Sequence, residues 1–396
     1  MPRPKTSLPK GFVTLWSTVA LDLVGFGIVV PILGRYAERF GASGFEVGLL
    51  FASFSLAQLI CAPLLGRLSD RIGRKPVILI SLVGTAIGSF ITAAAGALWV
   101  LFIGRILDGA SGASVAVVQG AVTDIAPVEE RPRLLGLIGA AFGVGFVIGP
   151  ALGGLAALGA THLPFLVAGT LATINAIVAW FRVPETRTVR SVPGPRVRTR
   201  SVRLWDLAVV GFVAVTAFSG FEATFSLLMG ERFDLTESGV AAVFVFVGLT
   251  LVASQIVLIR PANGALGVAG SLQAGLVLNL VGFFALSVAE SWVVLVPALV
   301  ALTIGQGLVS PNLSTLVAGS VPDERRGEAL GFQQGVNAAG RVAGPALAGV
   351  LFDHVDIGVD RGAPYIVGAL LCGLALTISV PRYGRRDATG CVSGTG

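Results

Sequence analysis

Five ionisable side chains lie inside long apolar stretches of this sequence, where no water is at hand to solvate a charge. They are Asp22, Arg105, Asp108, Glu222 and Arg341. An arginine or aspartate at the centre of a bilayer costs about 2.5–3.5 kcal/mol on insertion scales, so such a residue faces other helices and has a partner. Embedded carboxyl groups can bind and release protons, and embedded arginines can control that exchange. The pattern therefore predicts proton binding inside a membrane.

We place the proton on Asp22, which lies in the middle of the first apolar run. Asp108 follows Arg105 by three residues and therefore shares its helix face, which makes it the nearest partner of the arginine. A movement that changes the distance between Asp22 and Arg105 would load and unload the proton. Three alternatives stay open: a permanent salt bridge at Asp22, a purely structural Arg105–Asp108 pair, and Glu222 as the proton site.

The elements that hold these residues are predicted to be membrane-spanning helices. Of the 396 residues, 54% are hydrophobic and only 13% are charged, against about 25% charged in soluble domains. A helical span needs about 20 mostly apolar residues. Runs of this kind predict twelve spans: 11–33, 45–65, 77–95, 98–120, 134–157, 163–183, 205–229, 238–259, 266–288, 292–318, 330–352 and 363–381. The expected fold class is an all-α membrane protein.

Lysine and arginine counts predict the orientation of these spans. With the N-terminus inside, 22 of the 28 basic residues fall on the cytoplasmic side and 4 on the other. Cytoplasmic loops carry the excess of Lys and Arg, so we expect both termini in the cytoplasm and a multi-pass protein of the plasma (inner) membrane. The net charge of +6 comes from scattered short loops, which indicates topology signals and not a nucleic-acid surface.

The chain is predicted to consist of two halves of six spans. Residues 1–183 form the N-terminal bundle, 184–204 a basic cytoplasmic linker, 205–381 the C-terminal bundle and 382–396 a cytoplasmic tail. Residues 127–154 and 322–349 align without a gap, and 12 of the 28 positions are identical. Spans five and eleven both enter from the cytoplasm, so the halves are expected to be parallel repeats about an axis along the membrane normal.

The segment between spans two and three carries a specific motif. It reads Gly66-Arg67-Leu68-Ser69-Asp70-Arg71-Ile72-Gly73-Arg74-Lys75. This string resembles the G-x-L-x-D-R-x-G-R-K signature of the major facilitator superfamily, in the loop where the family has it. The resemblance implies a twelve-helix fold with a midplane cavity, in which these residues latch the outward-facing state. The family also has an arginine motif in span four, and the string that begins at Arg105 resembles it. This resemblance implies that Arg105 influences proton release.

Span five carries a second family motif. Its small residues and proline are Gly145, Gly149, Pro150, Gly153 and Gly154. Small residues at this spacing allow close helix packing, and the proline removes a backbone hydrogen bond. The string resembles the antiporter motif G-x-x-x-G-P-x-x-G-G, which implies drug/proton exchange. The residues around Asp22 resemble the first helix of the tetracycline-exporter-like branch.

Polar residues in other spans are candidates for the substrate cavity: Glu222, Asn175, Gln255, Asn312 and Arg341. The three cysteines show no spacing typical of a disulfide framework or a metal site. The sequence has no phosphate-binding loop and no hydrolase motif, so we expect no enzyme activity, no cofactor and a proton gradient as the energy source.

The sequence thus predicts a proton-coupled antiporter that exports a small, lipophilic compound by alternating access and functions as a monomer. Two alternatives remain: a proton-coupled transporter of a polar metabolite such as a sugar, and a non-transporting receptor or scaffold with this fold.

Overall fold

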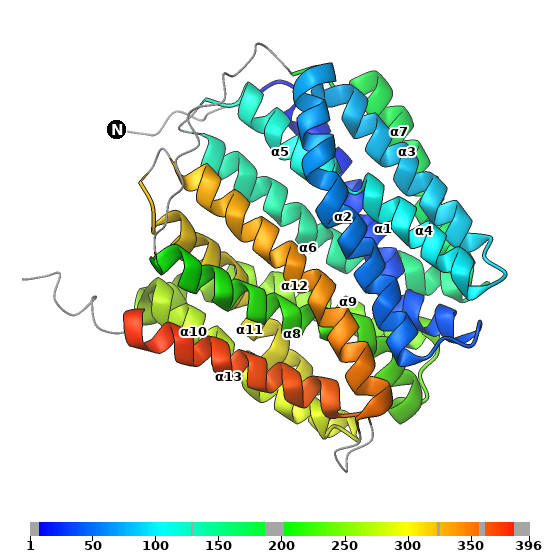
Figure 1. The fold of residues 1–396 in the computed structure, drawn as a ribbon, viewed down its shortest axis with the longest axis vertical. Coiled ribbons are helices and arrows are strands. Elements are labelled where there is room, and N and C mark those ends of the chain that lie inside the picture. Colours follow the sequence, from blue (N-terminus) through cyan, green and yellow to red (C-terminus); the bar gives the residue numbers. More distant parts are fainter. Residues whose placement is uncertain (1–7, 128–129, 187–201, 323–324, 356–360, 384–396) are drawn as a thin grey trace, which may run out of the picture. The chain divides into compact units, whose positions relative to one another are not determined.

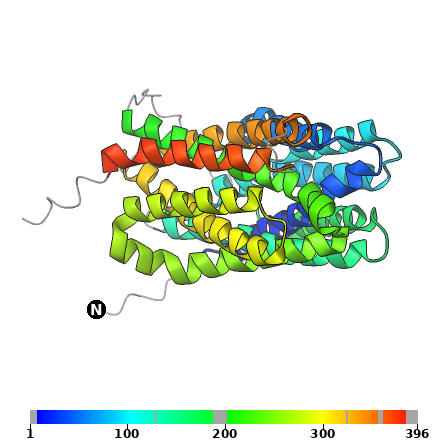
Figure 2. The ribbon, with the colours of Figure 1, turned by 90° about the horizontal axis from the view of Figure 1, so that it is seen from below.

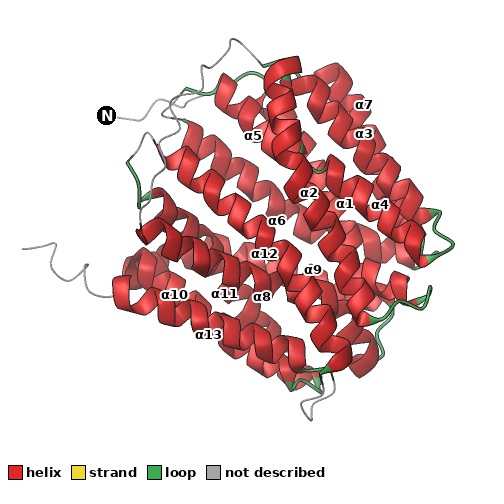
Figure 3. Cartoon of the chain, viewed as in Figure 1, coloured by secondary structure: helices red, strands yellow, loops and turns green. Residues whose placement is uncertain are grey.

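The computed structural model of the chain describes residues 8–127, 130–186, 202–322, 325–355 and 361–383 (Figure 1). These residues form helices joined by loops, without a strand among them (Figure 3). The elements are α1 Phe12–Glu38, α2 Gly44–Ile72, α3 Arg74–Ala93, α4 Leu98–Ser111, α5 Ser114–Ile125, α6 Arg131–Ala157, α7 Leu163–Arg182, α8 Val202–Phe233, α9 Glu237–Ala253, the π-helix η1 Ser254–Leu258, α10 Ile259–Ser287, α11 Trp292–Ala318, α12 Arg326–His354 and α13 Ala363–Tyr383. The all-α prediction is confirmed. Most of the predicted linker, residues 187–201, and the tail from 384 lie outside the described residues.

The described helices have the length and composition of membrane spans. Nine stretches are long and apolar enough to cross a membrane, and one of them, Glu237–Ser287, has 51 residues and covers two predicted spans. Helices α12 and α13 cover the last two predicted spans. Large apolar side chains such as Trp99 and Phe181 are 65% and 77% exposed. This exposure suits a surface in contact with lipid, because apolar side chains there contact hydrocarbon and not water.

The fourth predicted span, 98–120, is not one continuous helix. Helix α4 ends at Ser111, α5 begins at Ser114, and the backbone at Gly112 has φ −73° and ψ 41°. All residues around the interruption are small or apolar, so hydropathy could not reveal it. The consequence is a helix start in the middle of a span.

Two predicted loops are also largely helical. Helix α2 continues to Ile72, and the only non-helical residue before α3 is Gly73, which has φ 110°. The predicted turn at 260–265 lies within a helical stretch, and the break comes at Gly267 with φ 71°. Both breaks occur at glycines because a positive φ costs a residue without a Cβ almost nothing.

The chain divides into two compact units. Unit 1 comprises residues 1–41, 53–195 and 236–245, and unit 2 comprises 42–52, 196–235 and 246–396. The start of α2 thus belongs to unit 2 and the start of α9 to unit 1. In unit 1, α1 packs on α6 and α7, and α3 packs on α4 and α7. In unit 2, α8 packs on α12 and α13, and α10 lies beside α11, as Figures 1 and 2 both show.

Each unit has an apolar core at the contacts between its helices. The core of unit 1 includes Leu15 of α1, Val77 of α3 and Val118 of α5, and the core of unit 2 includes Leu207 of α8 and Leu276 of α10. Close-packed apolar side chains fix the helices against one another, so each polar site described below has a rigid frame.

Candidate functional site

Asp22 lies on α1 in unit 1 and is half-buried. Its carboxylate accepts a short hydrogen bond from the hydroxyl of Ser114, the first residue of α5. Ser114 itself is only 2% exposed. None of the ion pairs formed by the described residues includes Asp22, so a neutral hydroxyl is its principal partner.

Arg105 and Asp108 form a buried ion pair on α4. Arg105 Nη1 lies 2.9 Å from Asp108 Oδ2, and Arg105 is 3% exposed. The guanidinium carbon lies 4.2 Å from the centre of the Phe54 ring, and the Asp108 carboxylate is also hydrogen-bonded by Thr85. A cation over an aromatic face is attracted by the ring quadrupole. The arginine charge is therefore balanced by Asp108 and further stabilised by the ring of Phe54 on α2.

The predicted proton-coupling residues thus share one unit. Arg105 pairs with Asp108, as their spacing indicated, and not with Asp22. The Asp108 charge acts on Asp22, so the influence of Arg105 on Asp22 passes through Asp108. Sequence reasoning missed Ser114, because a serine at a helix start is recognisable only when the helix break is known.

The predicted gating motif forms an ion-pair network at the junction of α2 and α3. Arg74 pairs with Asp70 at 2.7 Å and with Asp124 of α5 at 2.9 Å. Arg74 Nη1 also donates to Ser69 Oγ, which in turn donates to the carbonyl of Gly66. Asp70 therefore pairs with the arginine four residues further along the same motif.

The start of α3, directly after Gly73, is capped by a residue that the sequence did not indicate. Glu185 accepts hydrogen bonds from the backbone N–H groups of Arg74 and Lys75 at 2.9 and 3.1 Å. A carboxylate at a helix N-terminus satisfies free N–H groups and complements the helix dipole. The other two basic residues of the motif, Arg67 and Arg71, lie exposed in the last turns of α2.

The predicted antiporter motif brings α6 into close contact with α1. A Cβ atom on Gly145 would lie 2.6 Å from the carbonyl oxygen of Leu23, and one on Gly149 would lie 2.6 Å from backbone atoms of Gly27. Gly153 approaches Ile28 in the same way. These contacts run beside Asp22, so the motif sets how closely α6 approaches the helix that carries the carboxyl group.

The other two residues of the motif, Pro150 and Gly154, lie in different surroundings. Pro150 lies inside α6, where it cannot donate a backbone hydrogen bond. Gly154 faces Ala241 of α9, whose Cβ lies 2.8 Å from the position that a Cβ on this glycine would take.

The residues predicted to line the substrate cavity lie in different surroundings. Asn175 is 1% exposed and donates to the carbonyl oxygen of Thr18, so it links α7 to α1. Asn312 is also 1% exposed and donates within α11, to Leu308. Gln255 lies exposed in the π-helix η1. The first two side chains are occupied in packing.

Glu222 of α8 and Arg341 of α12 both belong to unit 2. Glu222 is half-buried, Arg341 is exposed, and the arginine charge acts on the Glu222 carboxylate. Two residues further along α8, the hydroxyl of Thr224 lies 3.2 Å from the hydroxyl of Tyr365 on α13 in a buried hydrogen bond. Like Asp22, Glu222 belongs to none of the ion pairs formed by the described residues.

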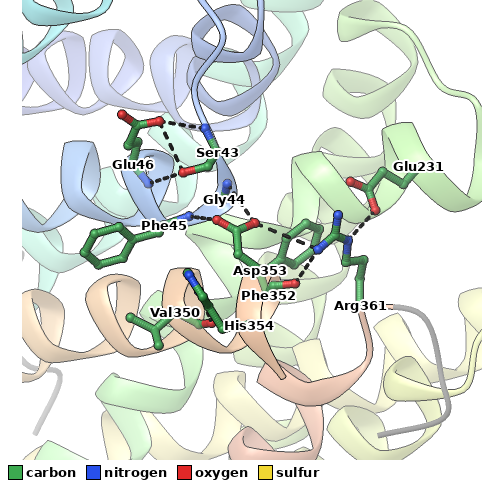
Figure 4. Close-up of polar contacts among 10 residues, drawn as sticks. All are labelled: Ser43, Gly44, Phe45, Glu46, Glu231, Val350, Phe352, Asp353, His354 and Arg361. Atoms are coloured by element: carbon green, nitrogen blue, oxygen red, sulfur yellow. Dashed lines mark hydrogen bonds and ion pairs between the residues drawn. The ribbon is translucent and has the colours of Figure 1, made fainter. Parts of the chain in front are cut away.

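A further polar cluster in unit 2, which we call the Asp353 cluster, joins α2, α8 and α12 (Figure 4). The Asp353 carboxylate accepts hydrogen bonds from the backbone N–H groups of Gly44 and Phe45 at 3.0 and 2.7 Å. Arg361 lies 3.9 Å from Asp353 and pairs with Glu231 at 2.9 Å. Asp353 therefore caps the first turn of a helix more than 300 residues away in sequence.

The sequence matches the family model of the Major Facilitator Superfamily over residues 15–270 and 264–389. It is 30% identical over 375 residues to the tetracycline resistance protein, class C, of Escherichia coli, covering 91% of this chain and 94% of the relative. It is 31% identical over 369 residues to the class D protein of Salmonella ordonez, covering 90% and 93%. It is 28% identical over 372 residues to multidrug resistance protein 1 of Bacillus subtilis (strain 168), covering 92% and 95%.

Solved transporter structures share the fold. The human organic anion transporter MFSD10 has a TM-score of 0.71 at 24% identity, covering 93% of this chain and 98% of that one. A bacterial homologue of the human lysosomal transporter Spinster, in an inward-facing and occupied conformation, has a TM-score of 0.73 at 13% identity, covering 93% and 95%. The helices and the motifs define a membrane transporter. The chain belongs to the Major Facilitator Superfamily, as the motif resemblance predicted.

Proposed function

We propose that this protein exports a small, lipophilic compound of the tetracycline type in exchange for protons. Relatives whose names record tetracycline or multidrug resistance align with nearly the whole chain, which supports drug export. The observation that carries the proton part of the proposal is the pairing of Asp22 with a neutral hydroxyl beside the Arg105–Asp108 ion pair.

Asp22 is the carboxyl group best suited to exchange a proton. Asp108 has a guanidinium 2.9 Å away, so protonating it would leave the arginine charge buried without a counterion. Glu222 also lies outside the ion pairs of the described residues, but the charge that acts on it is the opposite charge of Arg341, whereas the charge that acts on Asp22 is the like charge of Asp108. Protonation of Asp22 instead removes a charge that no ion pair balances. An uncompensated charge in a membrane interior is the one whose neutralisation gains most.

Exchange requires that binding of the substrate and binding of the proton favour different states of the transporter. A ligand shifts a conformational equilibrium only through a difference in its affinity for the two states. The Arg74 network is a set of contacts that a change of state can make or break, and the glycine contacts of α6 hold Asp22 in a defined frame. We place the protein in the plasma (inner) membrane as a monomer, with both termini in the cytoplasm.

Purified protein in liposomes tests the proposal directly. Inside-out orientation and an imposed pH gradient, acid inside, should drive tetracycline and the lipophilic cation ethidium into the vesicles against their concentration gradients. Collapse of the gradient with an ionophore should release both compounds. Accumulation that ignores the pH gradient would refute proton exchange, and gradient-driven movement of a sugar instead of both compounds would refute the substrate class.

A further inference from the structure

The interruption between α4 and α5 exposes backbone polar groups in the middle of a span. A helix end leaves carbonyl groups without helical partners, and within a membrane each must be satisfied by protein. The structure satisfies two of them locally. The Gly112 N–H donates to Gly109 at 3.0 Å, and the Ala113 N–H donates to Ser111 at 2.7 Å.

Gln58 of α2 satisfies a third carbonyl group. Its side-chain nitrogen donates to the carbonyl oxygen of Gly112 at 2.8 Å. Gln58 lies so close to Gly112 that a Cβ atom on this glycine would be only 2.7 Å from the Gln58 side-chain nitrogen. A side chain from another helix, α2, therefore holds the interruption in place.

The interruption also sets the position of Ser114. Because α5 begins at this residue, the hydroxyl that binds Asp22 lies in the first turn of a helix. The break thus sets the position from which the Ser114 hydroxyl reaches Asp22.

Few other charges act at this point. Asp108 and its partner Arg105 come from α4. The helices packed against α1 contribute no ionisable residue between 134 and 157 of α6 or between 163 and 181 of α7. In α5, the ionisable residue is Asp124, which is engaged by Arg74 near the end of that helix. The state of Asp22 therefore depends on the α4 pair and on the start of α5.

We propose that Ser114 and Gln58 are positioning residues for the proton on Asp22: Ser114 holds the ionised carboxylate, and Gln58 holds the helix interruption that presents Ser114. This inference rests on the proposed proton exchange. The proton is then released when the start of α5 meets Asp22 and is taken up when the two separate. Movement at one point of the fourth span is enough to couple the proton to a change of state.

Replacement of Ser114 tests the first half of the proposal. Purified full-length protein in detergent is mixed with tetracycline in weak buffer, and the released protons are measured with an indicator dye across a pH series. In Ser114→Ala the carboxylate loses a donor, so the pH of half-maximal release should rise by about one unit. Ser114→Thr keeps a hydroxyl and should retain the wild-type profile.

Ser81→Ala is the matched control. Ser81 lies on α3 and is 1% exposed, and its hydroxyl has no hydrogen-bond partner among the described residues. This variant should release protons at the wild-type pH. A general effect of removing a buried hydroxyl would shift both alanine variants equally and would overturn the proposal.

Replacement of Gln58 tests the second half. Gln58→Met keeps the length of the side chain and removes the donor to Gly112, so the profile should shift in the same direction as in Ser114→Ala. Because both residues act through one hydrogen bond to Asp22, the double variant should shift no further than Ser114→Ala alone. Additive shifts would show that Gln58 acts elsewhere and would contradict its role.

The outcomes separate this inference from the proposed function. A wild-type protein that binds tetracycline but releases no proton refutes proton exchange itself. A wild-type protein that releases protons with the same profile as Ser114→Ala refutes only the positioning role. Loss of tetracycline binding in Ser114→Ala also refutes that role, because Ser114 would then contact the substrate.

Discussion

Replacement of Gly149 by alanine should separate the α1 and α6 helices. The added Cβ would lie 2.6 Å from backbone carbon atoms of Gly27 and 2.7 Å from the carbonyl oxygen of Val24. These atoms belong to the helix backbone and cannot turn away as a side chain can. The two helices must therefore move apart by several tenths of an ångström to reach ordinary van der Waals contact.

The cost follows from the type of contact. Overpacking of a well-packed interior costs about 1–3 kcal/mol. Gly139→Ala on the same helix is the control, because nothing lies within 4 Å of a Cβ at that position. There the substitution should stabilise α6 by about 0.5–1 kcal/mol, since alanine loses less conformational freedom than glycine. The two variants should therefore differ in sign.

Unfolding by a denaturing detergent, followed by circular dichroism, measures this difference. Gly149→Ala should have a lower free energy of unfolding than the wild type, and Gly139→Ala an equal or higher one. Equal free energies for Gly149→Ala and Gly139→Ala would refute the reasoning, because the close approach of α1 and α6 would then carry no energetic weight.

The Asp353 cap, the gating motif and the distribution of Lys and Arg each predict a measurable effect. Asp353→Ala should lower the free energy of unfolding by about 0.5–2 kcal/mol, the value of a helix cap, whereas Asp353→Asn should lose less because it keeps an acceptor; equal losses would contradict the cap. Asp70→Asn should fold normally but impair tetracycline transport by changing the balance of states, so unchanged transport in vesicles would remove Asp70 from the mechanism. An impermeant thiol reagent should label a cysteine introduced at Ala42 in intact cells and none introduced in the 184–204 linker, and labelling of the linker would reverse the orientation.

Much of the fold could be predicted from the sequence because the position of a membrane span depends mainly on the length of an apolar run. Unbroken apolar runs predicted the helices, and gaps in them predicted most ends. The exceptions occur where hydropathy carries no signal. The residues around Gly112 are as apolar or small as those of an intact helix, and the polar stretch 260–265 is helical because the turn forms at Gly267 instead.

The candidate site could be predicted only in part, for a similar reason. Asp22, Arg105 and Asp108 were recognisable because charges in apolar runs are rare, and the i, i+3 spacing indicated the ion pair. Ser114 and Gln58 were not, because their partners, Asp22 and Gly112, lie 92 and 54 residues away in sequence. Contacts of this kind depend on how helices are packed, which residue type and spacing do not specify.

The central claim is that Asp22 carries the exchanged proton, and Asp22→Asn tests it most directly. The amide resembles the protonated acid in shape but cannot release a proton. In vesicles with a pH gradient as the only driving force, this variant should bind tetracycline with an affinity close to that of the wild type and should not accumulate it against a gradient. Uphill accumulation at the wild-type rate would contradict the claim and make Glu222 the next residue to test.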